Sequence, residues 1–153
     1  MIARALIVVV WCWLSGAAPA AAEGLAALLP RELAATVVQQ CSRAVPRISG
    51  TWQPSESQIR QLEADFRLLE GHKDEACCNP SASLKDPLHY YRQYVGVIRD
   101  GRRLIYINAF REPAPPDWRT TPVVVCDGGD GYWGVLYDPV LRTFSQLAFN
   151  GIG

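Results

Sequence analysis

The sequence predicts an α+β domain in which two N-terminal helices pack on a curved antiparallel sheet of about five strands. Apolar residues recur at helical spacing in the first half of the chain and at the alternating spacing of strands in the second half. Asp100-Gly101, a dipeptide favoured in two-residue hairpin turns, separates two strand-like segments. A run of helices followed by a run of strands is typical of the α+β class.

The first 22 residues have the pattern of a secretory signal peptide. Arg4 precedes an apolar run from Ala5 to Leu14, and small residues follow up to Ala22, after which we expect cleavage. The apolar run is shorter than the roughly 20 residues that a membrane-spanning helix needs. We therefore expect residues 23–153 to form a single periplasmic or secreted domain that has no transmembrane span after cleavage.

Composition limits the classes of partner. The chain has 15 basic and 15 acidic residues, and 49% of its residues are hydrophobic, which suits one domain with a substantial core. Loss of Arg4 with the leader would leave a formal charge of −1. Because no excess of positive charge remains, nucleic acid is not an expected partner.

Two segments carry the helical pattern. The first starts at Leu29 and stops at Pro46. The second begins where Ser55 and Gln58 have the spacing of a capping box, and Gly71 ends it. Its apolar residues form one stripe, which comprises Ile59, Leu62, Phe66 and Leu69.

The Asp100-Gly101 turn also fixes the register of the first hairpin, which spans residues 89–111. A two-residue turn places Val97 opposite Leu104 and Tyr91 opposite Phe110. Both faces of this hairpin then carry apolar side chains. We expect one face to pack on the helices, and the other to be closed by sheet curvature, by the N-terminal helix or by a partner, such as a second copy in a homodimer.

The sequence "DGGDG" at residues 127–131 lies between strand-like residues 123–126 and 132–138, and residues 143–151 form a last strand-like segment. Because glycine adopts positive φ easily, we interpret the loop as a hairpin turn. Asp127 and Asp130 do not have EF-hand spacing. A calcium site built from carbonyls and carboxylates is the alternative.

The cysteines predict a covalent framework. Four remain after the leader is removed, and an even number in an exported chain favours disulfides. A bond between the adjacent Cys77 and Cys78 would close a strained ring. We therefore expect Cys41 and Cys126 each to pair with one of these two residues, in either order.

The loop that contains the adjacent cysteines offers an alternative function. His72, Cys77, Cys78 and His89 lie within 18 residues, and two thiolates with two imidazoles can bind zinc or copper. The usual spacing of two residues between zinc-binding cysteines is absent. A small periplasmic metal-binding protein is therefore the second hypothesis.

Candidate catalytic groups are few. A Cys126 and His89 dyad would need a free thiol, and Asp127 paired with Asp130 or Asp138 could act as acid and base. No nucleotide fingerprint, serine elbow or zincin motif occurs. We expect no cofactor, and an enzyme with a pocket beneath the sheet is the third hypothesis.

The leading hypothesis is an exported, disulfide-stabilised, non-enzymatic binding module that recognises a protein or a cell-envelope component. Arginine and aromatic residues, which are enriched in binding hot spots, are interleaved along the hairpin and the Pro-rich segment after it. The expected binding surface comprises Tyr90, Arg92, Tyr94, Tyr106, Arg111 and Trp118. The alternative interpretation is cross-strand aromatic pairing with arginines at the strand ends.

The order of one helix followed by antiparallel strands, over Pro54–Gly151, resembles the cystatin-like and NTF2-like layouts, in which a helix lies across a curved sheet. The resemblance is one of layout and is carried by no shared motif. It implies that a ligand would meet the concave sheet face or the hairpin loops, and it implies no particular activity.

Overall fold

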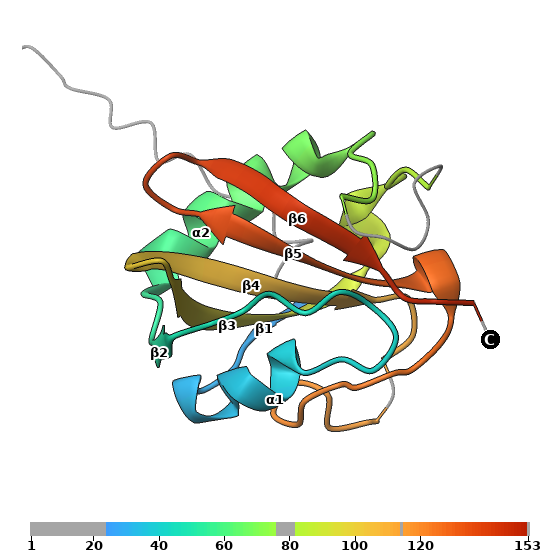
Figure 1. The fold of residues 1–153 in the computed structure, drawn as a ribbon, viewed down its shortest axis with the longest axis horizontal. Coiled ribbons are helices and arrows are strands. Elements are labelled where there is room, and N and C mark those ends of the chain that lie inside the picture. Colours follow the sequence, from blue (N-terminus) through green and yellow to red (C-terminus); the bar gives the residue numbers. More distant parts are fainter. Residues whose placement is uncertain (1–23, 76–81, 114, 153) are drawn as a thin grey trace, which may run out of the picture.

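The computed structural model describes residues 24–75, 82–113 and 115–152, so the expected leader and Cys77 and Cys78 lie outside the described residues. The described residues form a six-stranded sheet with two α-helices and several short 3-10 helices (Figure 1). The strands are β1 (Ala26–Leu28), β2 (Gly50–Trp52), β3 (Tyr91–Arg99), β4 (Arg102–Phe110), β5 (Tyr132–Asp138) and β6 (Thr143–Phe149). The helices are η1 (Arg31–Leu33), α1 (Ala34–Val38), α2 (Glu56–Asp65), η2 (Phe66–Leu69), η3 (Pro87–His89) and η4 (Gly129–Gly131).

The α+β class is confirmed, but the expected placement of two helices ahead of the sheet is not. The strand order is β1-β3-β4-β5-β6, and β2 also pairs with β3. Both short strands lie on the outer edge of β3, where β1 runs parallel and β2 antiparallel. They are too short to show an alternating pattern in the sequence, yet they satisfy backbone groups that would otherwise form an open edge.

The register predicted for the first hairpin is confirmed. Val97 pairs with Leu104 and Tyr91 with Phe110. Asp100 and Gly101 have φ values of 50° and 74°, as a two-residue turn with positive φ at both central positions requires. The turn alone therefore sets which side chains face each side of the sheet.

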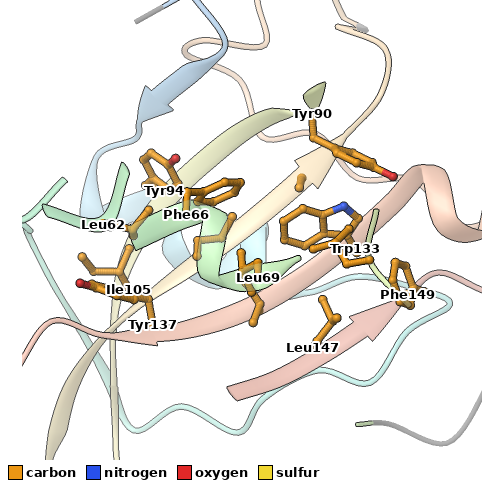
Figure 2. Packing of buried hydrophobic residues seen from close by; sticks show 14 of the residues in the cluster. Leu62, Phe66, Leu69, Tyr90, Tyr94, Ile105, Trp133, Tyr137, Leu147 and Phe149 are labelled. Atoms are coloured by element: carbon orange, nitrogen blue, oxygen red, sulfur yellow. The ribbon is translucent and has the colours of Figure 1, made fainter. Parts of the chain in front are cut away.

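Helix α2 begins as the sequence predicts. The Ser55 hydroxyl accepts a hydrogen bond from the Gln58 amide, and the Gln58 side chain accepts one from the Ser55 amide at 2.9 Å. The helix continues as η2, so Phe66 and Leu69 complete the apolar stripe, and both are fully buried. Figure 2 shows this stripe packed against side chains of β3, β4 and β5.

Trp133 lies at the centre of this first core, which fills one face of the sheet. Its ring is 6.1 Å from that of Phe66 and 5.4 Å from that of Tyr90, measured between centroids. Leu147 and Phe149 of β6 complete the cluster on the far side (Figure 2).

A second core fills the opposite face. Val37 and Val38 of α1 pack with Val95, Leu104 and Leu136 from three strands. The N-terminal helix therefore closes the second apolar face, which selects one of the alternatives that the sequence left open. Figure 1 shows α1 and α2 on opposite sides of the sheet.

Helix α1 is shorter than the pattern up to Pro46 predicts. It ends at Val38, because Gln39 leaves helical geometry with ψ of 84°. The Gln40 side-chain amide then donates hydrogen bonds to the carbonyls of Val37 and Val123 at 2.9 and 3.2 Å. These bonds hold the chain after α1 against residues 123–126, so the helix does not continue.

Residues 123–126 are not a strand, contrary to prediction. The Val123 amide donates to the Gln93 side chain at 3.0 Å, and its carbonyl also accepts from Asn108 at 2.8 Å. Buried polar side chains thus satisfy this backbone in place of a strand ladder. Val123 is buried and Val124 is 45% exposed, so this apolar run indicates neither a strand nor uniform burial.

Cys41 and Cys126 form a disulfide, with their Cα atoms 4.9 Å apart. The expected pairing of each with Cys77 or Cys78 is therefore wrong. The reason is the early end of α1, which brings the following loop onto residues 123–126.

Among the described residues, no helix is long and apolar enough to cross a membrane.

Candidate functional site

An open cleft of about 850 Å³ lies where residues 82–90 approach the glycine-rich loop, residues 127–131. Its polar lining side chains are Ser83, Lys85, Arg111, Asp127 and Asp130, and its apolar ones include Ala82, Tyr90, Phe149 and Ile152. We refer to it as the charged cleft. It is built from four segments that are far apart in the sequence.

The glycine-rich loop is not the hairpin turn that the sequence predicts, because no strand precedes it. Gly128 and Gly129 have φ values of 95° and 52°, and a short 3-10 turn leads directly into β5. A Cβ atom at Gly128 would overlap the ring of Tyr132. Glycine is therefore needed here both for its backbone conformation and for its lack of a side chain.

The C-terminal segment holds the glycine-rich loop in place. The Gly129 amide donates to the Gly151 carbonyl at 3.1 Å. The Asn150 side chain donates to the carbonyls of Val125 and Asp127 at 2.7 and 3.0 Å. The loop backbone is fixed by these bonds, while the side chains of Asp127 and Asp130 remain exposed at the rim.

Arg111 and Tyr90 lie beside the glycine-rich loop and contact it directly. Two guanidinium nitrogens of Arg111 donate to the Tyr90 hydroxyl at 3.3 and 3.2 Å, and the guanidinium lies 5.5 Å from the ring centroid. Tyr90 in turn donates to the Asp130 carbonyl at 3.0 Å. Hydrogen bonding with Tyr90 is the largest cause that raises the pKa of Arg111 above its usual value, so this side chain is a fixed cation.

The four charged side chains of the cleft differ in how they are paired. Arg111 Nη2 lies 3.6 Å from an Asp130 carboxylate oxygen. Lys85 and Asp127 form no ion pair with any other residue that the structure describes. One cation and one anion are therefore available to a ligand.

A buried ion pair lies beside the cleft but outside it. Arg92 donates to both carboxylate oxygens of Glu63 at 3.1 and 2.7 Å, and to the Tyr90 carbonyl at 2.8 Å. Tyr94 donates to the same carboxylate, and the Arg92 guanidinium lies 4.6 Å from the Phe66 ring centroid. These contacts use the polar atoms of the group to attach α2 to β3, which indicates a structural role.

A second buried arginine, Arg43, was not singled out by sequence reasoning. It donates to the side-chain oxygens of Asn108 and Asn150 at 2.5 and 3.2 Å, and its guanidinium lies 5.9 Å from the Tyr106 ring centroid. No carboxylate pairs with it among the described residues. Burial lowers the pKa of Arg43, and the residue links the loop after α1 to the C-terminal segment that supports the cleft.

Comparisons with protein-family models, curated proteins and solved structures find no match for this chain. A function for this chain is therefore inferred from the geometry of the charged cleft.

The residues of the expected binding surface are not brought together on the outside of the protein. Tyr90, Arg92, Tyr94, Tyr106 and Trp118 are buried, and of the six only Arg111 has an exposed side chain. Tyr90 and Arg111 meet at the cleft. Tyr91 and Phe110 form a cross-strand aromatic pair with ring centroids 6.1 Å apart, as the alternative predicts, and Trp118, from the segment after β4, packs edge-on against both.

Of the candidate catalytic groups, Asp127 and Asp130 both line the charged cleft, whereas Cys126, His89 and Asp138 do not line it. Cys126 is bonded to Cys41 and offers no free thiol for a dyad with His89. Asp138 is the last residue of β5, where its side chain accepts hydrogen bonds from the amides of Val140 and Leu141. No cluster of three or more potential metal ligands occurs within residues 24–75, 82–113 and 115–152.

Proposed function

We propose that the protein is an exported, disulfide-stabilised binding module whose binding site is the charged cleft. The main observation behind this proposal is that the backbone around the cleft is held by hydrogen bonds, while two charged side chains in its lining form no ion pair with any described residue. Backbone hydrogen bonds hold the glycine-rich loop, while Lys85 and Asp127 point to no partner among the described residues. Binding sites commonly present a few polar groups on a rigid support.

The expected localisation and the disulfide support each other. A leader-like N-terminus would send the chain to the periplasm or the outside medium, where a bond between Cys41 and Cys126 would persist. The first hairpin contributes Tyr90 and Arg111 to the site. We therefore propose a protein or cell-envelope component as the partner, recognised at one end of this hairpin rather than along its faces.

Mapping a partner onto the surface tests this proposal. Purified protein is added to envelope and culture-medium fractions, captured material is identified, and the backbone amide shifts that it induces are recorded. We expect shifts at residues 83–85 and 127–131, and loss of capture in Lys85→Gln or Asp127→Asn. Arg60→Gln, on the exposed face of α2, is the control and should capture normally. Shifts confined to other surfaces would overturn the proposal.

The pairing of Cys41 with Cys126 favours metal binding as the second candidate. It leaves Cys77 and Cys78 free of the bonds that were expected to oxidise them, so both thiols could join His72 and His89. Thiol titration with elemental analysis of the purified protein tests this candidate. Two reactive thiols and one bound zinc or copper would support it, whereas no reactive thiol and no metal would exclude it.

A further inference from the structure

We propose that the charged cleft recognises a short peptide-like ligand that presents both a carboxylate and an ammonium group. Lys85 and Arg111 would meet the carboxylate, and Asp127 would meet the ammonium group. This inference rests on the proposed function of the cleft and specifies its ligand.

The charge balance of the cleft favours a ligand that carries charges of both signs. Two cations and two anions line it, and the Arg111–Asp130 pair accounts for one of each, although both side chains are more than half exposed. A ligand with charge of one sign would meet repulsion as well as attraction. A ligand with both signs finds a complement for each group, which gives specificity.

The aromatic residues of the cleft favour a peptide over a sugar as the ligand. Tyr90 is 3% exposed and Phe149 is 1% exposed, so both close the floor and neither presents an open ring face for stacking. Apolar contact comes instead from Ile152, which is 83% exposed and lies against Gly129. An aliphatic rim beside separate charges suits a peptide with an apolar side chain better than a saccharide.

Hydrogen bonds fix the backbone of the two segments that carry the charged side chains of the cleft. The Leu84 amide and carbonyl are both bonded, to the His72 carbonyl and the Gly71 amide at 2.8 Å each. Lys85 therefore directly follows a fixed residue and lines the same cleft as the glycine-rich loop, which Gly151 and Asn150 fix in turn. Because both rims are ordered without ligand, little conformational entropy is lost on binding.

Four forms of one tripeptide test the proposal. Ala-Leu-Ala with free ends, its N-acetyl form, its C-terminal amide and the doubly blocked form are titrated into the purified protein, and amide shifts at residues 83–85 and 127–131 are followed. We expect the free tripeptide to bind and each blocked end to weaken binding about fivefold, as for a solvent-accessible charge pair. A neutral trisaccharide should cause no shift there.

The variants assign each end of the ligand. Lys85→Gln should distinguish the free acid from the amide less than wild type does, because Arg111 remains, while it still prefers the free amine. Asp127→Asn should show the opposite pattern, and Arg60→Gln should behave as wild type.

Equal binding of all four tripeptides, or preferential binding of the trisaccharide, would overturn the peptide proposal while leaving the cleft as a binding site. The absence of shifts from all four tripeptides would also overturn it. Failure of the proposed function itself would be recognised separately, by mapping of a captured partner to another surface.

Discussion

Burial of charge distinguishes the arginine pairs of two glutamates that share helix α2. Glu63 faces β3 and pairs with Arg92, whose side chain is 1% exposed, whereas Glu56 pairs with Arg60 in solvent and is 91% exposed. Removing one member of a buried pair leaves an uncompensated charge, while removing a surface partner changes little. The two glutamates therefore provide an internal comparison.

We predict that Glu63→Gln lowers the free energy of unfolding by about 3 kcal/mol. Glu56→Gln should change it by less than about 0.5 kcal/mol. Urea unfolding of the two variants and the wild type measures the difference. Similar small changes in both variants would contradict a structural role for the buried pair.

Asp65 predicts how stability depends on pH. Hydrogen bonds from Arg142, at 2.9 and 2.5 Å, are the largest cause that lowers the pKa of this buried carboxyl, and Tyr137 donates a further bond at 2.6 Å. A carboxyl whose pKa is lower in the folded state stabilises the fold above its unfolded pKa of about 4. That stabilisation is lost as pH falls through the folded value.

Asp65→Asn should therefore be less stable than wild type at pH 7, and the difference should shrink steadily between about pH 4 and pH 2. Urea unfolding at several pH values measures the difference. A difference that stays constant over this range would show that the ionised carboxylate is not the stabilising species.

At the level of elements, the glycine that lets β2 approach β3 is more sensitive than its neighbours. A Cβ atom at Gly96 would overlap the Trp52 carbonyl and lie 2.8 Å from Pro54 Cδ. A Cβ atom at Gly50, on the partner strand, would lie 3.4 Å from the side chain of Ile98, which is ordinary contact. Close backbone approach, rather than a special φ value, is the reason for glycine at residue 96.

We predict that Gly96→Ala costs about 1–3 kcal/mol of unfolding free energy, because the backbone must shift to relieve the overlap. Gly50→Ala should cost clearly less. Thermal unfolding compares the two variants, and hydrogen exchange at residues 50–52 shows whether β2 has detached. Equal effects of both substitutions would contradict the steric explanation.

Sequence patterns predicted the long elements and missed those fixed by distant side chains. The capping box at Ser55 and the turn at Asp100-Gly101 act locally, so helix start and hairpin register follow from neighbouring residues. Residues 123–126 look like a strand because they are apolar, but Gln93 and Asn108 supply their hydrogen bonds from another part of the chain. A run of apolar residues does not identify the groups that bond its backbone.

The candidate site was predicted only in part for the same reason. Tyr90 and Arg111 were singled out by their residue types, and the glycine-rich loop by its composition. Lys85 has no distinguishing sequence context, and it becomes a candidate only because the fold places it in the lining of the same cleft as Asp127. Juxtaposition of this kind depends on the whole chain.

At the scale of the whole molecule, the disulfide joins the helical half to the last third of the chain, across a separation of 85 residues. Closing so long a loop restricts the unfolded chain and stabilises the fold by about 4.6 kcal/mol in the entropic estimate. We predict that Cys41→Ser with Cys126→Ser lowers the unfolding free energy by up to this amount. Reductant should lower the wild-type value similarly and leave the double variant unchanged.

Peptide mapping checks the bond itself. Trypsin places Cys41 in residues 32–43, Cys126 in residues 120–142, and both adjacent cysteines in residues 74–85. Without reductant, the first two peptides should be recovered joined to each other. Recovery of either one joined to residues 74–85 would restore the pairing first expected from the sequence.

The same bond also changes how backbone damage would be detected. Strands β2, β3 and β4 and helix α2 all lie on the covalent ring that Cys41 and Cys126 close. After one proteolytic cut anywhere on that ring, the disulfide still joins the two fragments covalently. A nicked molecule would therefore migrate as an intact chain in a non-reducing gel and separate into two bands only after reduction.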